Sequence, residues 1–296
     1  MKHAFLFLAL LLAVSGLADS LPQAYSSFGV LVVTQLESAP FPHPLRAEGH
    51  KYKDQVFSAR EHYQDNTVAI FIPRGFKGGA QADVVVHFHG WKNHVEGVLK
   101  RYQLIEQLIG SRRNAVLVVP QGPRDASDSF GGKLEDPDGF KRFMNDVLEV
   151  LRQQPGFNKD CQAGRIVLSG HSGGYQVISS ILARGGLSEK VREVWLFDAL
   201  YAQSDKFMAW MDKENGRLID IYTEHGGTKE KSEELANLLK KRGTPLFSGK
   251  ELEAKASDLK TNHFIFLFSE LEHNDVLDKH KTFAEFLKTS ALSEIP

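Results

Sequence analysis

Cysteine is almost absent from this chain of 296 residues, in which Cys161 is the single example. A single thiol cannot form an internal disulfide, and a single cysteine also excludes a zinc site built from several cysteines. An excess of one charge is also lacking, because 36 lysines and arginines face 37 aspartates and glutamates, for a formal net charge of −1. A nucleic-acid binder or a polybasic membrane-surface protein would need an excess of cations. The sequence therefore argues against both classes.

Long apolar runs are missing from everything except the first 18 residues. A short basic start is followed by nearly unbroken apolar sequence over Ala4–Ala18, which ends in small residues at Gly16 and Ala18. This pattern predicts a secretory signal peptide at 1–18, since the run is shorter than the roughly 20 residues that span a bilayer as a helix. An uncleaved anchor is the alternative. We expect residues 19–296 to form one domain of a secreted or periplasmic protein without a membrane span.

The rest of the chain has no linker, no charge block and no internal repeat. Short apolar runs predict eight strands, at residues 29–35, 66–72, 83–88, 115–119, 165–168, 191–197, 217–222 and 263–268. Helical spacing is found at residues 97–109, 140–153, 175–183, 206–211, 229–242 and 283–287. Strands that alternate with helices predict an α/β protein with a doubly wound, mostly parallel sheet and helices on both faces. The first two strands have no helix between them, which predicts an antiparallel pair at one edge.

Residues that directly follow strands are the first candidates for a site, because ligands of such sheets bind beyond the carboxyl ends of the strands. Gly170-His171-Ser172-Gly173-Gly174 fits the pattern G-x-S-x-G between a strand and a helix. This context predicts a tight turn that exposes the Ser172 hydroxyl as a nucleophile, with the Gly173 N–H as a donor to an oxyanion. The structural alternative is a glycine-rich helix start that Ser172 merely caps.

On this motif and on its order of strands and helices, the chain resembles the α/β-hydrolase superfamily. The resemblance implies that nucleophile, acid and histidine follow one another along the sequence, and that a second oxyanion donor comes from the loop after the third strand. That loop reads His87-Phe88-His89-Gly90-Trp91, and the Trp91 N–H is the candidate donor. No cofactor is implied.

A metal site is the rival interpretation of the same loop. His87, His89 and His94 have the spacing H-x-H-x4-H. Hydrolytic zinc sites of this kind need an aspartate shortly after the first pair, and none is present. We therefore expect no metal, and we expect His87 to be a core histidine that supports the loop.

The resemblance places the catalytic histidine after the last strand. His273 follows that strand, whereas His263 lies at the wrong end of it and His280 falls in the presumed helix. We expect His273 to be the general base, and a solvated loop histidine is the structural alternative.

Two residues compete for the acid. Asp198 ends an apolar strand, where a carboxylate is costly to bury without a cationic or N–H partner. Glu224 follows the next strand, at the commonest family position, which here has no aspartate at the expected offset. We favour Asp198 and keep Glu224 as the alternative; the structural alternatives are a helix cap for Asp198 and a loop contact for Glu224.

The polar loop at residues 120–133 follows a strand at the edge where loops commonly shape substrate pockets, and Arg124 or Lys133 could meet an anionic substrate there. A solvated loop is an equally good interpretation. Together the patterns predict a secreted serine hydrolase that cleaves a carboxylic ester through an acyl-enzyme intermediate. A serine peptidase or amidase with the same triad is one alternative, and a non-catalytic binding protein with this fold is another. The substrate is an ester of unknown identity.

Overall fold

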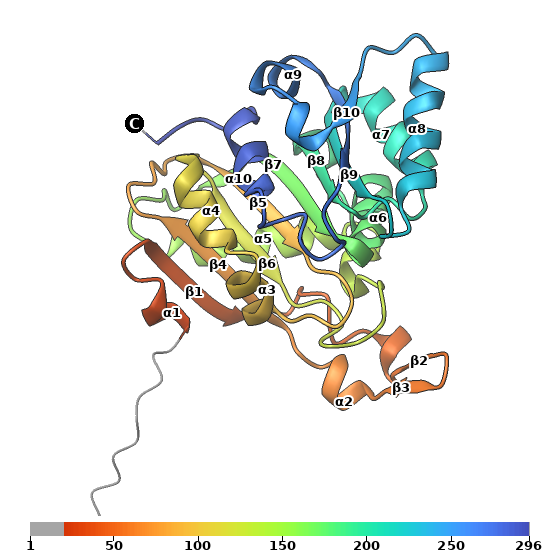
Figure 1. Ribbon diagram of the computed structural model, residues 1–296. Helices are drawn as coiled ribbons and strands as arrows, with labels where there is room; N and C mark the ends of the chain where they lie inside the picture. The colour runs from red at the N-terminus through yellow and green to blue at the C-terminus, as the bar shows by residue number, and fades with distance from the viewer. Residues whose placement is uncertain (1–20, 296) are drawn as a thin grey trace, which may run out of the picture.

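The computed structural model describes residues 21–295, and the predicted signal peptide at 1–18 lies outside the described residues. A sheet of nine strands runs through the described part of the chain (Figure 1). It contains all eight predicted strands: β1 (Gly29–Gln35), β4 (Thr67–Pro73), β5 (Gln81–Phe88), β6 (Val116–Pro120), β7 (Gln162–His171), β8 (Val191–Phe197), β9 (Arg217–Thr223) and β11 (Phe264–Ser269).

The predicted sheet of eight strands was one strand too few. The ninth strand, β10 (Phe247–Lys250), pairs in parallel with β11 at the edge of the sheet. Its four residues read FSGK, and two of them are exposed. Such a short, half-exposed segment contains no apolar run from which a strand could be predicted. It is a strand because its main chain pairs with β11.

The strand order is β1-β4-β6-β5-β7-β8-β9-β11-β10. The predicted antiparallel pair is confirmed, since β1 pairs with β4 antiparallel. Strand β4 is also antiparallel to β6, so it alone opposes the rest of the sheet, and the pairs from β6 to β10 are parallel. The carboxyl ends of β5, β7, β8 and β11 therefore meet at one edge.

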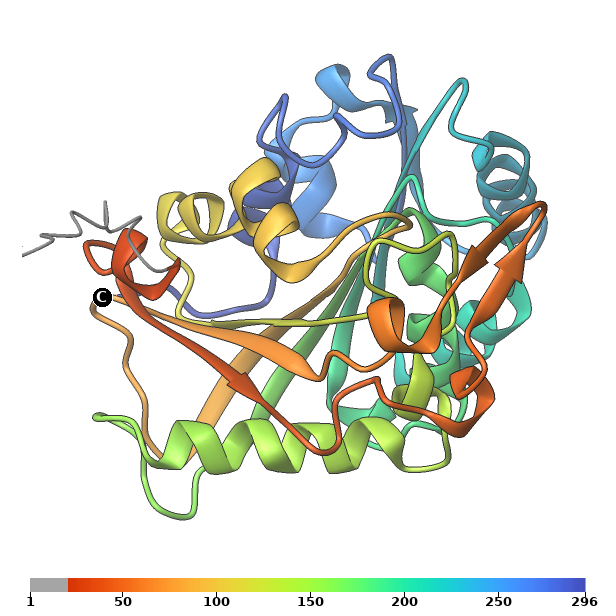
Figure 2. The same cartoon turned by 90° about the horizontal axis from the view of Figure 1, so that it is seen from below.

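Helices cover both faces of the sheet, as Figure 2 shows, and the predicted α/β class is confirmed. One face carries α3 (Val95–Arg101), α4 (Leu104–Ser111), α9 (Ala256–Thr261) and α10 (Thr282–Thr289). The other carries α5 (Gly139–Arg152), α6 (Tyr175–Arg184), α7 (Ser204–Glu214) and α8 (Lys229–Lys241). The valines of β5 serve both layers, because Val84 and Val86 pack in the core on one face and Val85 in the core on the other.

The helical pattern at residues 97–109 forms two helices instead of one. Gln103 separates α3 from α4 in a left-handed conformation with φ of +49°. The buried Gln107 side chain donates to the Tyr102 carbonyl oxygen at 2.7 Å, which holds the break in place. Periodicity alone could not show the break, since apolar residues continue through it.

Residues 50–63 form a small unit beside the active-site edge. The hairpin of β2 (His50–Tyr52) and β3 (Gln55–Phe57) is followed by α2 (Ala59–His62), with Ser58 as its cap. Tyr52 packs edge-on against Trp91, with ring centroids 4.8 Å apart. This hairpin could not be predicted from the sequence, because its strands are too short for an alternating pattern.

The remaining elements are short: α1 (Leu21–Ala24) and the 3-10 turns η1 (Pro44–Arg46), η2 (Gly132–Glu135), η3 (Ser172–Gly174), η4 (Ser188–Lys190) and η5 (Glu251–Glu253). Within residues 21–295, none of the helices has the length and apolar character needed to cross a membrane.

Candidate active site

Ser172 lies at a sharp turn between β7 and α6. Its φ of +53° is in the left-handed region, which is uncommon for a residue with a side chain. Glycine is needed on both sides of it: a Cβ at Gly170 would lie 2.7 Å from Ile178 Cδ1, and one at Gly174 would lie 2.7 Å from the Phe88 carbonyl oxygen. The strand–turn–helix predicted around Ser172 is therefore present, and the turn projects Ser172 beyond the sheet edge.

The loop after β5 lies directly against this turn. A Cβ at Gly90 would stand 2.6 Å from Ser172 Cβ, and one at Gly173 would stand 2.9 Å from Trp91 Cδ1. The Gly173 N–H belongs to the first turn of a helix, where main-chain donors have no helical partner. The Trp91 N–H likewise has no hydrogen-bond partner among residues 21–295. Two main-chain donors without a partner among the described residues thus belong to the turn of Ser172 and to the loop packed against it.

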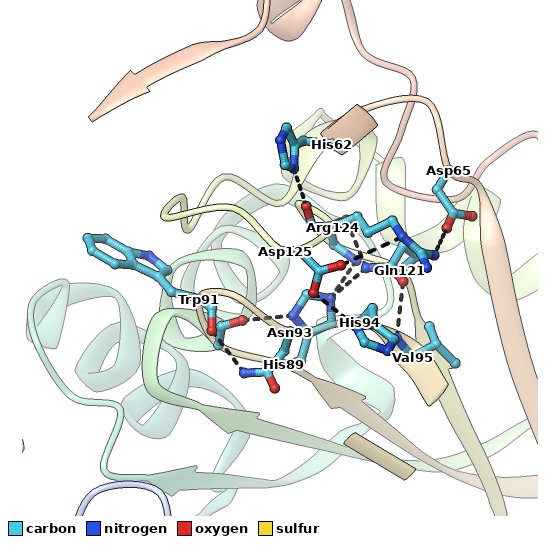
Figure 3. A network of polar contacts seen from close by, with 12 residues as sticks. His62, Asp65, His89, Trp91, Asn93, His94, Val95, Gln121, Arg124 and Asp125 are labelled. Atoms are coloured by element: carbon cyan, nitrogen blue, oxygen red, sulfur yellow. Dashed lines mark hydrogen bonds and ion pairs between the residues drawn. The ribbon is translucent and has the colours of Figure 1, made fainter. Parts of the chain in front are cut away.

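A buried histidine holds the Gly90–Trp91 loop in place. His89 Nδ1 donates to the Gly90 carbonyl oxygen at 2.8 Å, and its Nε2 accepts the Gly122 N–H at 3.0 Å. Gln121 approaches the same Nε2 at 3.0 Å and accepts the Val95 N–H, which begins α3 (Figure 3). Burial lowers the pKa of His89 and keeps the ring neutral, as an acceptor at Nε2 requires.

A second set of contacts extends from the same loop. Asn93 donates to the Trp91 carbonyl oxygen at 2.9 Å, and Asp125 bonds both to the Asn93 carbonyl and to His94 Nδ1 (Figure 3). Arg124 pairs with Asp65 at 2.6 Å. The loop is therefore anchored to residues 121–125 by several independent bonds.

Asp198 and His273 are brought together from the ends of β8 and β11. His273 Nδ1 lies 2.7 Å from Asp198 Oδ2, and Asp198 is fully buried. Thr223 Oγ1 donates to the same oxygen at 2.6 Å, and the Thr228 hydroxyl donates to Oδ1. Burial alone would raise the pKa of Asp198, but its hydrogen bonds, first that to His273, hold that pKa below the ordinary value. Asp198 is therefore a carboxylate that faces His273.

Glu224 does not reach His273. Its side chain is half exposed and pairs with Lys229 Nζ at 2.6 Å. The two residues that sequence reasoning left in competition thus occupy different surroundings, and only Asp198 has the geometry of a histidine partner.

His171 is a site residue that sequence reasoning missed. Its Nε2 bonds to the His273 carbonyl oxygen at 3.0 Å, and its Nδ1 lies 3.4 Å from the Tyr102 hydroxyl. Burial, with a smaller contribution from His273, lowers the pKa of His171 to about 3. A neutral ring that donates from Nε2 can fix the His273 backbone. The only signal in the sequence was its place directly before Ser172.

The three histidines of the rival metal motif are engaged separately. His87 Nδ1 lies 2.9 Å from Ser169 Oγ in the core, His89 holds the loop, and His94 pairs with Asp125. Within the part of the chain that the structure describes, no three His, Cys, Asp or Glu side chains gather as a metal site would require.

A cavity of about 220 Å³ opens beside Ser172. It is lined by three aromatic residues and by small ones: Trp91, Ser129, Ser172, Gly173, Tyr175 and Tyr201. The two cations proposed for a pocket from the 120–133 loop turn elsewhere, since Arg124 pairs with Asp65 and Lys133 donates to the Glu37 carbonyl oxygen. Both cations are therefore engaged away from this cavity.

This sheet with its exposed serine turn has the α/β-hydrolase fold, as comparison with solved structures shows. The structure resembles the feruloyl esterase module of Clostridium thermocellum with a TM-score of 0.55 and 9% identity over 90% of each chain. It also resembles the fluorophosphonate-binding serine hydrolase F of Staphylococcus aureus, with a TM-score of 0.52 and 12% identity over 88% of this chain and 99% of that one. It resembles a ferulic acid esterase as well, with a TM-score of 0.52 and 12% identity over 75% of this chain and 91% of that one.

At such identities the likeness concerns the fold. No family model matches the sequence, and no curated protein matches it.

Proposed function

We propose that this protein is a serine hydrolase that cleaves a carboxylic ester. The observation that carries the proposal is the pairing of His273 with the buried Asp198 at the sheet edge where the turn exposes Ser172. A histidine oriented by a carboxylate is what a serine nucleophile needs in order to lose its proton at neutral pH. The fold of the two esterases and the serine hydrolase described above supports the same class.

In the proposed reaction, Ser172 Oγ attacks the ester carbonyl while His273 Nε2 takes its proton. Asp198 accepts the Nδ1–H bond, which selects the tautomer with a free Nε2 and stabilises the imidazolium. The Gly173 and Trp91 N–H groups donate to the oxyanion, and each such donor contributes roughly 10²–10³-fold in rate. His273 then protonates the leaving alcohol, and water attacks the acyl-enzyme by the same steps. None of these steps calls for a metal or a cofactor.

The surroundings of Ser172 favour an ester with a planar group. Trp91, Tyr175 and Tyr201 line the cavity, and flat rings bind well against such walls.

Only residues 198–203 separate β8 from α7, which leaves no room for a large cap there. We infer that bulky or polymer-linked esters have access, and that the 1–18 segment directs the protein out of the cytoplasm.

The first experiment is labelling with a fluorophosphonate probe. The purified protein should be labelled at Ser172, as peptide mass spectrometry would show, and the Ser172→Ala variant should remain unlabelled. A folded wild type without label would instead favour a non-catalytic binding protein.

The second experiment separates esterase from amidase. A p-nitrophenyl ester and a p-nitroanilide with the same acyl group should be compared, first with acetyl and then with a hydroxycinnamoyl group. Turnover of the esters alone supports the proposal, and comparable turnover of the anilides would favour the peptidase alternative.

A further inference from the structure

Ser129 has a hydroxyl group with an unused hydrogen. Its Oγ accepts the indole Nε1–H of Trp91 at 2.8 Å, so this contact uses a lone pair and leaves the O–H free to donate. Among residues 21–295 no side chain or main-chain group accepts that hydrogen. Ser129 also lines the cavity of about 220 Å³ that Ser172 faces. The free donor is therefore at the wall of the space that a substrate would fill.

The hydroxyl lies between the two residues that supply the main-chain donors. A Cβ placed on Gly173 would stand 2.5 Å from Ser129 Oγ and 2.9 Å from Trp91 Cδ1. Ser129 is thus in contact with Gly173 on one side and with the Trp91 indole on the other. Ser129, Gly173 and Trp91 also line the same cavity beside Ser172.

The neighbours of Ser129 hold it rigidly. The buried Asp128 takes two bonds from Arg46, at 2.7 Å to Nε and 3.1 Å to Nη2, and a third from the Phe130 N–H at 3.0 Å. The Arg46 guanidinium in turn lies 4.6 Å from the centre of the Phe130 ring. Since the residues on both sides of Ser129 are fixed, its hydroxyl is held in place before a substrate binds, as an effective oxyanion donor requires.

The geometry points to Ser129 as a third donor, whose O–H bonds to the carbonyl oxygen of the ester as that oxygen gains negative charge. This inference rests on the proposed function, because it assigns Ser129 to the same reaction at Ser172. The indole N–H of Trp91 donates to one lone pair of Ser129 Oγ and so orients the hydroxyl with its hydrogen toward the cavity.

The test compares four variants in steady-state hydrolysis of one p-nitrophenyl ester. Ser129→Ala and Ser129→Cys both remove the strong donor, and Cys keeps the volume of the side chain. Each should lower kcat by about 100-fold with KM within about twofold, the pattern of a contact made mainly in the transition state. Trp91→Phe removes the indole N–H but leaves the hydroxyl, so its loss in kcat should be smaller, below about tenfold.

Ser127→Ala is the matched control, since Ser127 lies on the same loop and does not line the cavity. Its activity should equal that of the wild type, and a thermal melt should show all four variants folded. Equal losses of kcat in Ser129→Ala and Trp91→Phe would overturn the inference, and so would an effect of Ser129→Ala on KM alone. In either case, turnover by the wild type and labelling of Ser172 would still support the proposed function. An inactive, unlabelled wild type would overturn both.

Discussion

The ring of His171 lies against the ring of His273, with centroids 4.7 Å apart, while its Nε2 donates to the His273 carbonyl oxygen at 3.0 Å. His171 precedes the nucleophile, and His273 stands on a loop more than a hundred positions further along the chain. The contact therefore ties the loop of the general base to the turn of the nucleophile. It makes His171 a positioning residue in the proposed reaction.

Replacing His171 by Phe should lower kcat by about 10- to 100-fold with little change in KM. Phe preserves a flat ring but lacks the Nε2 donor, so the His273 loop loses its anchor, and small misplacements of a catalytic group have costs of this size. Initial rates with a p-nitrophenyl ester measure the effect, beside a thermal melt. His280→Ala, which alters an exposed histidine paired with Glu251, is the control and should keep full activity. Unchanged kcat in His171→Phe would show that the contact is only packing.

The two candidate acids should respond very differently to neutralisation. Asp198→Asn should lower kcat by about 10³-fold or more, because an amide cannot hold His273 in the required tautomer or stabilise its charge. Glu224→Gln breaks only the ion pair with Lys229 and should stay within about twofold of the wild type. Rates of ester hydrolysis at pH 7 measure both variants. If Glu224→Gln were the inactive one, the assignment of the acid would be wrong.

Gly226 gives an independent test of the acid. A Cβ at this position would lie 1.7 Å from Asp198 Oδ2, so Gly226→Ala must displace either the carboxylate or its loop. We expect most of the activity to be lost. Gly110→Ala is the matched control, since a Cβ there meets nothing within 4 Å. That variant should keep its activity and gain about 0.5–1 kcal/mol in the free energy of unfolding, because alanine is the better helix former.

Asp220 should make stability depend on pH. Both of its carboxylate oxygens are buried without a hydrogen-bond partner among residues 21–295, and burial raises its pKa to about 7. The unfolded chain releases this proton near its ordinary pKa of 3.8. Between pH 3.8 and about 7 the folded state holds a proton that the unfolded state has released. The free energy of unfolding is therefore most favoured by Asp220 at low pH and falls as the pH rises toward 7. Over this range the free energy of unfolding should fall by roughly 1.4 kcal/mol per pH unit, which amounts to a few kcal/mol in all.

Asp220→Asn removes this dependence, because the amide does not ionise. Urea denaturation between pH 4 and 8 should show a flatter curve for Asp220→Asn than for the wild type, and greater stability at pH 8. The exposed Asp212 pairs with Arg242 at the surface, so Asp212→Asn should leave the curve close to that of the wild type. Parallel curves for Asp220→Asn and the wild type would contradict a shifted Asp220.

The sequence by itself determined the elements that local patterns encode. Short valine-rich runs such as 83–88 favour buried strands, because β-branched side chains suit a strand better than a helix. Glycines around Ser172 allow a turn that other residues would block, so the class, the parallel sheet and the serine turn could be predicted. The strand β10 and the hairpin at 50–57 could not, since their short segments are stabilised by pairing and packing and not by an apolar period of their own.

The partner of His273 was decided only by the tertiary structure. Asp198 and Glu224 both stand at strand ends, and the apolar strand before Asp198 favours that residue without excluding Glu224. The choice arises because residues 223–228 fold back over Asp198 and give its carboxylate the Thr223 and Thr228 hydroxyls, while Lys229 draws Glu224 outward. Likewise, the contact of Ser129 with Trp91 and Gly173 joins three loops whose spacing in sequence carries no sign of it. Hydrogen bonds between distant loops form only once the sheet has placed those loops together.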